Sequence, residues 1–162
     1  MEPTIITRPA SKIVGYELKT NTSDGQQNRE IPVFWGDIMA SNQWEVFKKL
    51  PHRVDPGTEL GVCFPTNMET GDLSYVIAAE VTDFAGLPPD LFTAELPAAT
   101  YAVFTTPADD GAENIAPAIQ GTWEYIFQTW FPGSGYEFEE GKADFEYYGG
   151  GKVKIYIPVI KK

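Results

Sequence analysis

Residues 144–159, DFEYYGGGKVKIYIPV, place a glutamate between aromatic residues on one expected strand, and three glycines lead into a second, more apolar strand. Alternate residues of a strand point to opposite faces of a sheet. If Glu146 and Tyr148 point inward, they put a carboxylate in an apolar pocket. If Phe145 and Tyr147 do so instead, Glu146 is an ordinary surface residue. The alternation alone leaves both interpretations open.

Other residues offer weaker chemistry. Glu137 in SGYEF and Glu80 in AAEV are also acidic residues near apolar runs, and either could take the role of Glu146 if the facing differs by one residue. Cys63 would be nucleophilic only beside a base, and the single histidine, His52, lies in a polar, proline-rich stretch, so a Cys–His enzyme is disfavoured. The sequence also lacks Cys-x-x-Cys and calcium-loop spacings, so we expect no metal and no cofactor.

Length and charge restrict the class of protein. A chain of 162 residues is long enough for one compact domain, so residues 1–162 are expected to form a single domain. The formal net charge of −11 repels a phosphate backbone, which argues against direct nucleic-acid binding. The same charge favours a cationic ligand, although solubility explains it equally well.

The sequence indicates a cytoplasmic protein without membrane contact. Its single cysteine cannot form an internal disulfide, and the N-terminus lacks the pattern of a signal peptide. No apolar run approaches the roughly 20 residues that a membrane helix needs.

Two similar series of elements follow one another along the chain. Strands are expected at 4–7, 13–20, 59–65, 72–81, 91–98, 100–107, 143–148 and 152–160, where β-branched and aromatic residues alternate between turn signals. Pro158 suggests that the last strand lies at an edge or loses a pairing partner there. Polar stretches at 21–30 and 108–114 precede helical spacings, which are marked by Ile31, Trp35 and Ile38 and by Ile119, Trp123, Ile126, Phe127 and Trp130.

An offset of 88 residues aligns the two series, pairing Pro9 with Pro97 and Trp35 with Trp123. The sequence therefore predicts an α+β fold of tandem duplicated β-β-α-β-β (SHS2-like) halves, at about 1–84 and 90–162. They would form an antiparallel sheet with two main helices on one face and a ligand cleft at the pseudo-twofold. Trp35 and Trp123 would face each other there, or would simply pack on the sheet.

The patterns W-x-x-I-x-x-x-W-F-P, S-G-Y-E, D-F-E-x-Y and I-Y-I-P-V, between Trp123 and Val159, resemble the GyrI-like effector-binding domain of AraC-type and MerR-type multidrug-responsive regulators. The resemblance implies a ligand cleft at the pseudo-twofold. In drug-sensing members a buried glutamate faces lipophilic cations among aromatic rings. Glu146 matches that glutamate, and Tyr156 matches a tyrosine on the following strand.

The expected ligand is therefore a small lipophilic cation, held by one charge and several aromatic faces. An unpaired carboxylate in an apolar cleft is costly to ionise, and a bound cation offsets that cost. The residues expected to line the site are Glu146, Tyr148, Tyr156, Trp35, Trp123, Tyr16 and Phe127.

Because Met1 lies close to the first expected strand, the sequence suggests a stand-alone module without a DNA-binding domain, whose protein partner, if any, is unknown. Two other functions stay open at this point. A glutamate and a tyrosine in the cleft could act as base and acid in a small-molecule hydrolase. The acidic surface could instead bind a protein, as in gyrase-inhibiting relatives.

Overall fold

The computed structural model describes residues 1–106 and 115–162. The first half contains β1 (Thr4–Arg8), β2 (Ser11–Asn21), a short 3-10 turn (Ser23–Gly25), α1 (Gln26–Met39), α2 (Asn42–Lys48), β3 (Glu59–Asn67) and β4 (Asp72–Val81). The second half contains β5 (Phe92–Leu96), β6 (Ala99–Thr105), α3 (Ile115–Tyr125), a π-helical turn (Ile126–Trp130), α4 (Phe131–Gly133), β7 (Tyr136–Phe138), β8 (Asp144–Gly149) and β9 (Lys152–Lys161). Strands that flank helices in both halves confirm the predicted α+β class.

The described strands form one antiparallel sheet with the order β1-β6-β9-β8-β3-β4-β2-β5, and β7 adds to β9. The equivalent strands of the two halves are β1 and β5, β2 and β6, β3 and β8, and β4 and β9. When each strand is replaced by its equivalent, the strand order reads the same in the opposite direction. The sheet therefore has a pseudo-twofold axis between β8 and β3. The first strand of each half pairs with a strand of the other half: β1 pairs with β6, and β5 pairs with β2.

The offset of 88 residues seen in the sequence holds for the first two strands of each half. Adding it to the numbers of β1 gives those of β5. The register repeats as well, because Thr4 faces Val103 in one half and Gly15 faces Phe92 in the other. The two exchanged strands are thus held in equivalent ways.

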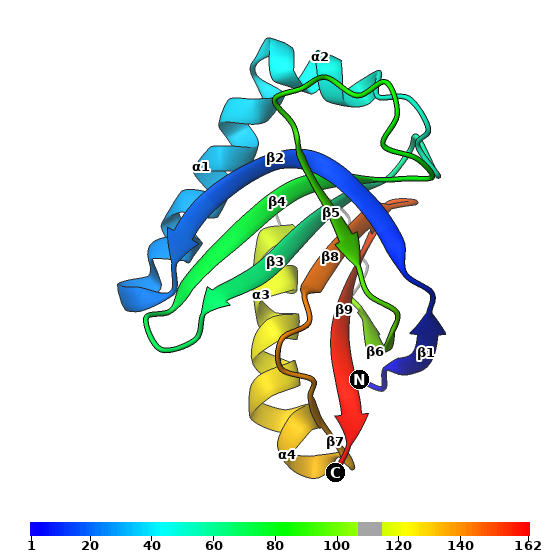
Figure 1. Cartoon of the computed structure of the whole chain (residues 1–162). Helices are drawn as coiled ribbons and strands as arrows, with labels where there is room; N and C mark the ends of the chain where they lie inside the picture. Colours follow the sequence, from blue (N-terminus) through cyan, green and yellow to red (C-terminus); the bar gives the residue numbers. More distant parts are fainter. Residues whose placement is uncertain (107–114) are drawn as a thin grey trace.

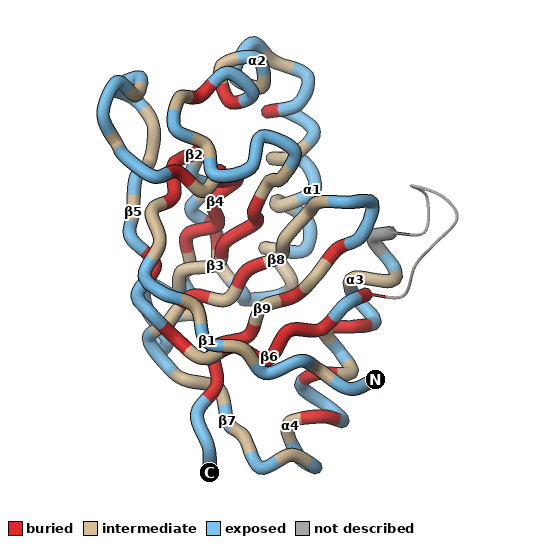
Figure 2. The backbone as a smooth tube through the Cα atoms, turned by 90° about the vertical axis from the view of Figure 1, so that its right-hand side faces the viewer, coloured by how far each residue is buried: buried red, intermediate tan, exposed pale blue. Residues whose placement is uncertain are grey.

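Helices α1 and α3 lie on the same side of the sheet (Figures 1 and 2). Each covers its own apolar cluster: α1 and α2 contribute Ile38 and Phe47 to a cluster around Ile77, and the second helical region contributes Ile126 and Trp130 to a cluster around Ile155. The boundary between the two clusters coincides with the pseudo-twofold axis.

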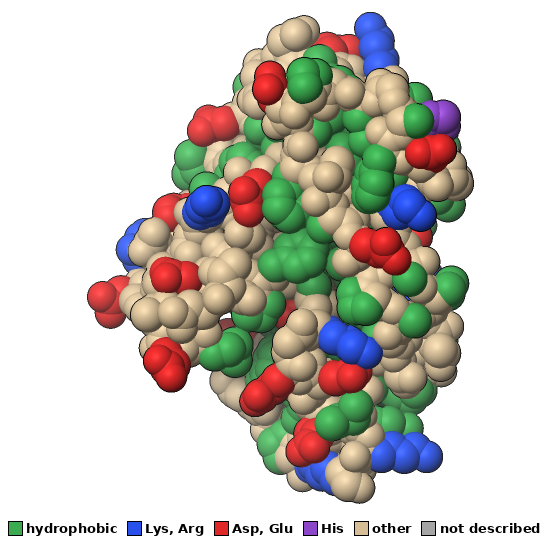
Figure 3. Space-filling model, in the orientation of Figure 1, with side chains coloured by type: hydrophobic (Ala, Val, Ile, Leu, Met, Phe, Trp, Pro, Cys, Tyr) green, Lys and Arg blue, Asp and Glu red, His purple; other side chains and the backbone are tan. Residues whose placement is uncertain are grey.

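The other face of the sheet is strongly curved and encloses a third apolar cluster drawn from both halves. Arg8 of β1 reaches Glu80 of β4 across this face at 3.1 Å, although the two strands lie far apart in the sheet order. The Arg8 guanidinium also lies over the rings of Phe145 and Tyr156, at 5.4 and 5.5 Å. Figure 3 views this side, where apolar side chains reach the surface between charged ones.

Two expectations from the sequence need correction or completion. Helix α1 begins at Gln26 within the stretch expected to be a polar loop, because Glu30 accepts hydrogen bonds from Thr20 and Gln26 and so fastens the polar first turns. Pro158 is not on an edge strand, since β9 lies between β6 and β8. At Pro158, strand β9 no longer pairs with β8, because the pairing between these two strands ends at Tyr156. The alternative expectation, loss of a pairing partner, therefore holds for β8. The polar loop expected at 108–114 lies outside the described residues.

Among the described residues, no helix has the length and apolar character to cross a membrane.

We predict that Arg8→Ala lowers the free energy of unfolding by about 1 to 3 kcal/mol, because it removes a partly buried ion pair and two cation–π contacts and leaves Glu80 unpaired. Lys48→Ala is the matched control, since its ion pair with Glu45 is exposed and should contribute under about 0.5 kcal/mol. Chemical denaturation measures both. Equal losses in the two variants would show that Arg8 does not fasten the exchanged strand β1.

Candidate functional site

The middle of the sheet, where β3 pairs with β8, carries polar side chains toward the helices. Opposed residues of an antiparallel pair point to one face, as does every second residue of each strand. Gly61 also pairs with Ile77, which belongs to the cluster under α1, and this fixes which face is the helix side. The opposed pairs on that side are Glu59 with Tyr148, Gly61 with Glu146, and Cys63 with Asp144, and we call these six residues the seam.

Glu146 and Tyr148 therefore face the helices, while Phe145 and Tyr147 face the curved side. The expectation that only one of these pairs is buried is wrong, because both faces of the strand are covered. Phe145 is fully buried in the third cluster. Glu146 is half-buried on the other face, so water still reaches a carboxylate that protein surrounds on most sides.

The environment of Glu146 disfavours its charge. Burial raises its pKa to about 7, and the hydrogen bonds from Trp123 and Tyr148 only partly oppose this shift. The Trp123 indole nitrogen lies 3.5 Å from Oε2. None of the salt bridges among the described residues involves Glu146, and residues 107–114 contain no lysine, arginine or histidine. The carboxylate thus has hydrogen-bond donors but no basic partner.

Both predicted tryptophans reach the seam, one from each helix. The Trp35 indole of α1 donates a hydrogen bond of 2.8 Å to the Tyr75 hydroxyl, and its ring meets that of Tyr148 edge-on at 5.3 Å. Trp123 of α3 contacts Glu146 directly. The glutamate and Tyr148 therefore have an aromatic ring from each half beside them.

Phe127 extends the aromatic surface of α3 outward. Its ring stacks on Trp123 with centroids 6.1 Å apart and planes inclined by 7°, and 49% of the residue is exposed. Phe127 belongs to the π-helical turn that interrupts this helical region. Such turns are frequent at functional sites because they change which residues a helix presents.

Three residues beside Glu146 were not predicted from the sequence: the seam residues Asp144 and Cys63, and Tyr75 next to the seam. Asp144 precedes Glu146 by two residues, so strand alternation could have placed both on one face. Burial and then the charge of Glu146 raise the pKa of Asp144 to about 7. Local sequence does not place Tyr75 and Cys63 beside Glu146, because their positions depend on how β3 pairs with β4 and β8.

Cys63 lacks the features of a nucleophile. Burial, followed by the charges of Asp144 and Glu146, raises the pKa of its thiol well above the usual value. The residue opposite Cys63 on the next strand is Asp144 rather than His52. A thiol held in its neutral form is a poor nucleophile. The described residues also contain no group of histidine, cysteine and acidic side chains that could hold a metal ion.

Two predicted site residues lie away from Glu146. Tyr156 pairs with Phe145 and packs in the cluster on the curved side, so the expectation that it shares a cleft with Glu146 is wrong. The face of β9 toward the helices is occupied there by Ile155 and Ile157 instead. Tyr16 is on the helix side, but it lies on β2, and its hydroxyl donates to the Gln43 carbonyl of α2.

The alternative acids are also elsewhere. Glu80 lies on the curved side, where it pairs with Arg8, and Glu137 is exposed on β7.

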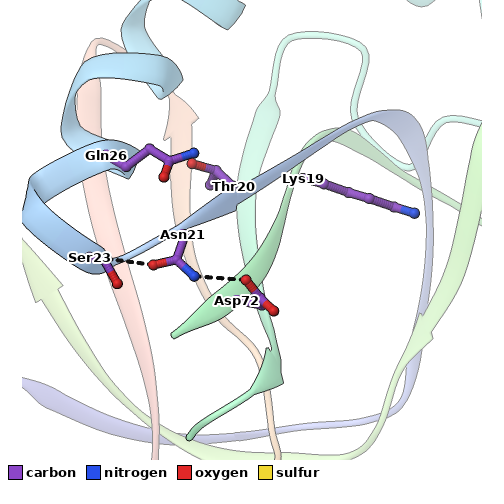
Figure 4. Close-up of a pocket in the computed structure, with 6 residues that line it drawn as sticks. All are labelled: Lys19, Thr20, Asn21, Ser23, Gln26 and Asp72. Atoms are coloured by element: carbon purple, nitrogen blue, oxygen red, sulfur yellow. Dashed lines mark hydrogen bonds between the residues drawn. The ribbon is translucent and has the colours of Figure 1, made fainter. Parts of the chain in front are cut away.

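An open polar hollow lies apart from the seam, at the far end of β2 (Figure 4). Its polar groups bond to one another: the Asn21 amide donates to Asp72 at 2.7 Å, and its oxygen accepts from the Ser23 amide at 2.6 Å. No aromatic residue lines it, so it is unsuited to a lipophilic ligand. The lining residues are Lys19, Thr20, Asn21, Ser23, Gln26 and Asp72.

Comparisons with known proteins identify similar sequences and similar structures. The sequence profile of Cass2, an integron-associated effector binding protein, matches residues 4–159. The transcriptional regulator BrlR of Pseudomonas aeruginosa is 27% identical over 98% of this chain. The chain spans 56% of the length of that regulator.

Solved structures share the fold at lower identity. SAV2435, in its complex with tetraphenylphosphonium, superposes with a TM-score of 0.80 at 19% identity, over 99% of this chain and 94% of that one. An integron cassette protein of Vibrio cholerae gives a TM-score of 0.67 at 17% identity, over 98% of this chain and 96% of that one.

The raised pKa of Glu146 predicts how stability changes with pH. Because folding favours the protonated carboxyl, the stabilising contribution is complete below the unfolded pKa and is lost as pH rises through about 7. Glu146→Gln removes this loss, so at pH 8 the variant should be more stable than the wild type by about 1 to 3 kcal/mol. Near pH 4 the two proteins should be alike.

Denaturation at both pH values measures this, with Glu137→Gln as the exposed control. A Glu146→Gln variant that is no more stable than the wild type at pH 8 would contradict a costly carboxylate at this position.

Proposed function

The chain belongs to the Cass2 family of integron-associated effector binding proteins, and from this premise we propose that it binds lipophilic cations at the seam between α1 and α3. Family membership confirms the resemblance to effector-binding domains and makes the chain a small-molecule-binding module. The charge of the ligand is our inference. One observation carries it: Glu146 lies among aromatic rings without a basic partner.

A cation is the ligand that this arrangement lacks. The free protein must either protonate Glu146 or leave a charge in poorly solvated surroundings. A bound cation stabilises the ionised form and recovers part of that cost. An anion would be repelled by the negative charges of Glu146 and Asp144. A neutral ligand would not offset the cost of ionising Glu146.

The aromatic rings suit a cation that makes few hydrogen bonds. Quaternary and delocalised cations are recognised through ring faces, at about 0.5 to 2 kcal/mol for each contact. Trp123 and Tyr148 lie beside the carboxylate, Trp35 packs against Tyr148, and the exposed Phe127 extends this surface. Their separation across two helices favours a ligand with several aryl groups over a compact ammonium ion.

The charge of the whole chain supports the same ligand class. A net charge of −11 attracts cations to the surface and opposes the approach of a phosphate backbone, so in this proposal the chain binds no nucleic acid directly. The ligand of SAV2435 provides a suitable probe, because tetraphenylphosphonium combines a delocalised charge with four aryl groups.

Replacing Glu146 with glutamine keeps its shape and removes its charge. We expect Glu146→Gln to weaken tetraphenylphosphonium binding by about 1 to 3 kcal/mol, as for the loss of a partly desolvated charge partner. Triphenylphosphine oxide, which has aryl groups but no net charge, should bind both proteins with similar affinity. Calorimetry with both compounds separates charge recognition from altered packing.

The pH provides a second test of the same carboxylate. Lowering pH from 8 to 5.5 should weaken cation binding in the wild type, because Glu146 becomes protonated, and should have a smaller effect in Glu146→Gln. Glu137→Gln should behave as the wild type. Equal cation affinities in the wild type and Glu146→Gln would contradict the proposed function.

A further inference from the structure

Gly61 leaves room beside Glu146 that another side chain fills. The two residues face each other across the pseudo-twofold axis. A Cβ atom at position 61 would lie 2.1 Å from the hydroxyl oxygen of Tyr75 and 2.9 Å from its Cζ. The phenol of Tyr75 therefore lies over the bare backbone of Gly61, with 1% of the residue exposed.

The hydroxyl of Tyr75 connects α1 with the surroundings of Glu146. The Trp35 indole donates to the Tyr75 hydroxyl at 2.8 Å, and the Trp35 ring meets that of Tyr148 edge-on at 5.3 Å. The Tyr148 hydroxyl lies close enough to Tyr75 and Glu146 for both to change its pKa. An ionised carboxylate can only accept hydrogen bonds, and an indole N–H can only donate one. A chain of hydrogen bonds between Trp35 and ionised Glu146 therefore has one direction: Tyr75 accepts from Trp35 and donates to Tyr148, and Tyr148 donates to Glu146.

We propose that Tyr75 is a positioning residue of the cation site, which holds the Tyr148 hydroxyl on Glu146 and couples the charge of that carboxylate to Trp35 on α1. This inference rests on the proposed function, because it assigns a role within the same site. Trp123 reaches Glu146 directly, so α3 needs no such intermediary. Trp35, on the helix of the first half, interacts with Glu146 only through Tyr75 and Tyr148.

The coupling follows from how hydrogen-bonded chains respond to charge. An ionised acceptor draws its donor closer and polarises each bond behind it. Ionisation of Glu146 by a bound cation would thus strengthen the bonds of Tyr148, Tyr75 and Trp35 in turn. The state of the ligand would reach both helices, one directly and one through the sheet.

Several other groups face Glu146 and set the background of any titration. None of those that shift its pKa or respond to its charge is a lysine or an arginine. Asp144 is the most important, because its charge and that of Glu146 repel each other. The titratable groups on the facing strands are Asp144 and Tyr148 on β8, Glu59 and Cys63 on β3, and Tyr75 on β4.

The indole N–H resonances of Trp35 and Trp123 test the coupling directly. They are assigned with Trp35→Phe and Trp123→Phe and followed by NMR between pH 5 and pH 9, with and without tetraphenylphosphonium. In the wild type both resonances should shift with one midpoint near the pKa of Glu146. In Tyr75→Phe the Trp123 shift should persist, and the Trp35 shift should fall to less than half.

The affinity for tetraphenylphosphonium at pH 7 provides a second readout. Tyr75→Phe should raise the dissociation constant about three- to tenfold, as for the loss of one supporting hydrogen bond, and should move the pH midpoint of binding upward. Tyr16→Phe is the matched control, since its hydroxyl bonds to α2 on the same face of the sheet. Tyr148→Phe removes the hydroxyl between Tyr75 and Glu146, and it should reduce the pH-dependent shift of the Trp35 resonance as Tyr75→Phe does.

The outcomes separate this inference from the proposed function. If Trp35 titrates in Tyr75→Phe and in Tyr148→Phe as it does in the wild type, Tyr75 is only a core residue and the coupling is refuted. If Glu146→Gln leaves both the Trp123 titration and the cation affinity unchanged, the proposed function fails instead.

Discussion

Ionising Glu146 costs free energy because its carboxylate is buried at the boundary between the two halves, beside Trp123 and Tyr148, and has no basic partner in the described chain. The surrounding features can be understood from this cost. Trp123 and Tyr148 donate hydrogen bonds that reduce the cost without removing it. Asp144 increases it by adding a second negative charge along the same strand. The site is stable while Glu146 is protonated, and a bound cation can take the place of that proton.

The duplicated architecture explains why the carboxylate lies where it does. Helices α1 and α3 cover equivalent halves of one sheet and leave a boundary at the pseudo-twofold axis, where β3 meets β8. The two halves differ at this boundary, because Glu146 of the second half faces Gly61 of the first. The missing side chain at Gly61 admits the phenol of Tyr75. A symmetric pair of glutamates would have doubled the charge and excluded that ring.

The sequence predicted the elements and the half of the site that depends on local pattern. The repeat placed Trp35 and Trp123 on equivalent helices, and the alternation of β8 placed Tyr148 with Glu146. Tyr156 was misplaced because the motif fixed its strand but not its face, and the face depends on the register between β8 and β9. Tyr75 and Cys63 were missed for a similar reason, since only the pairing of β3 with both neighbours brings them to Glu146. Pairings between strands distant in the chain leave no local signal.

Proton exchange on ligand binding tests most directly whether a cation meets a protonated Glu146. Calorimetric titration of tetraphenylphosphonium at pH 7, in buffers with different ionisation enthalpies, measures the number of protons released for each cation bound. Because the pKa of Glu146 lies at about 7, the wild type should release a substantial fraction of one proton, and Glu146→Gln should release much less. Binding without proton release, or with equal release in both proteins, would contradict the account.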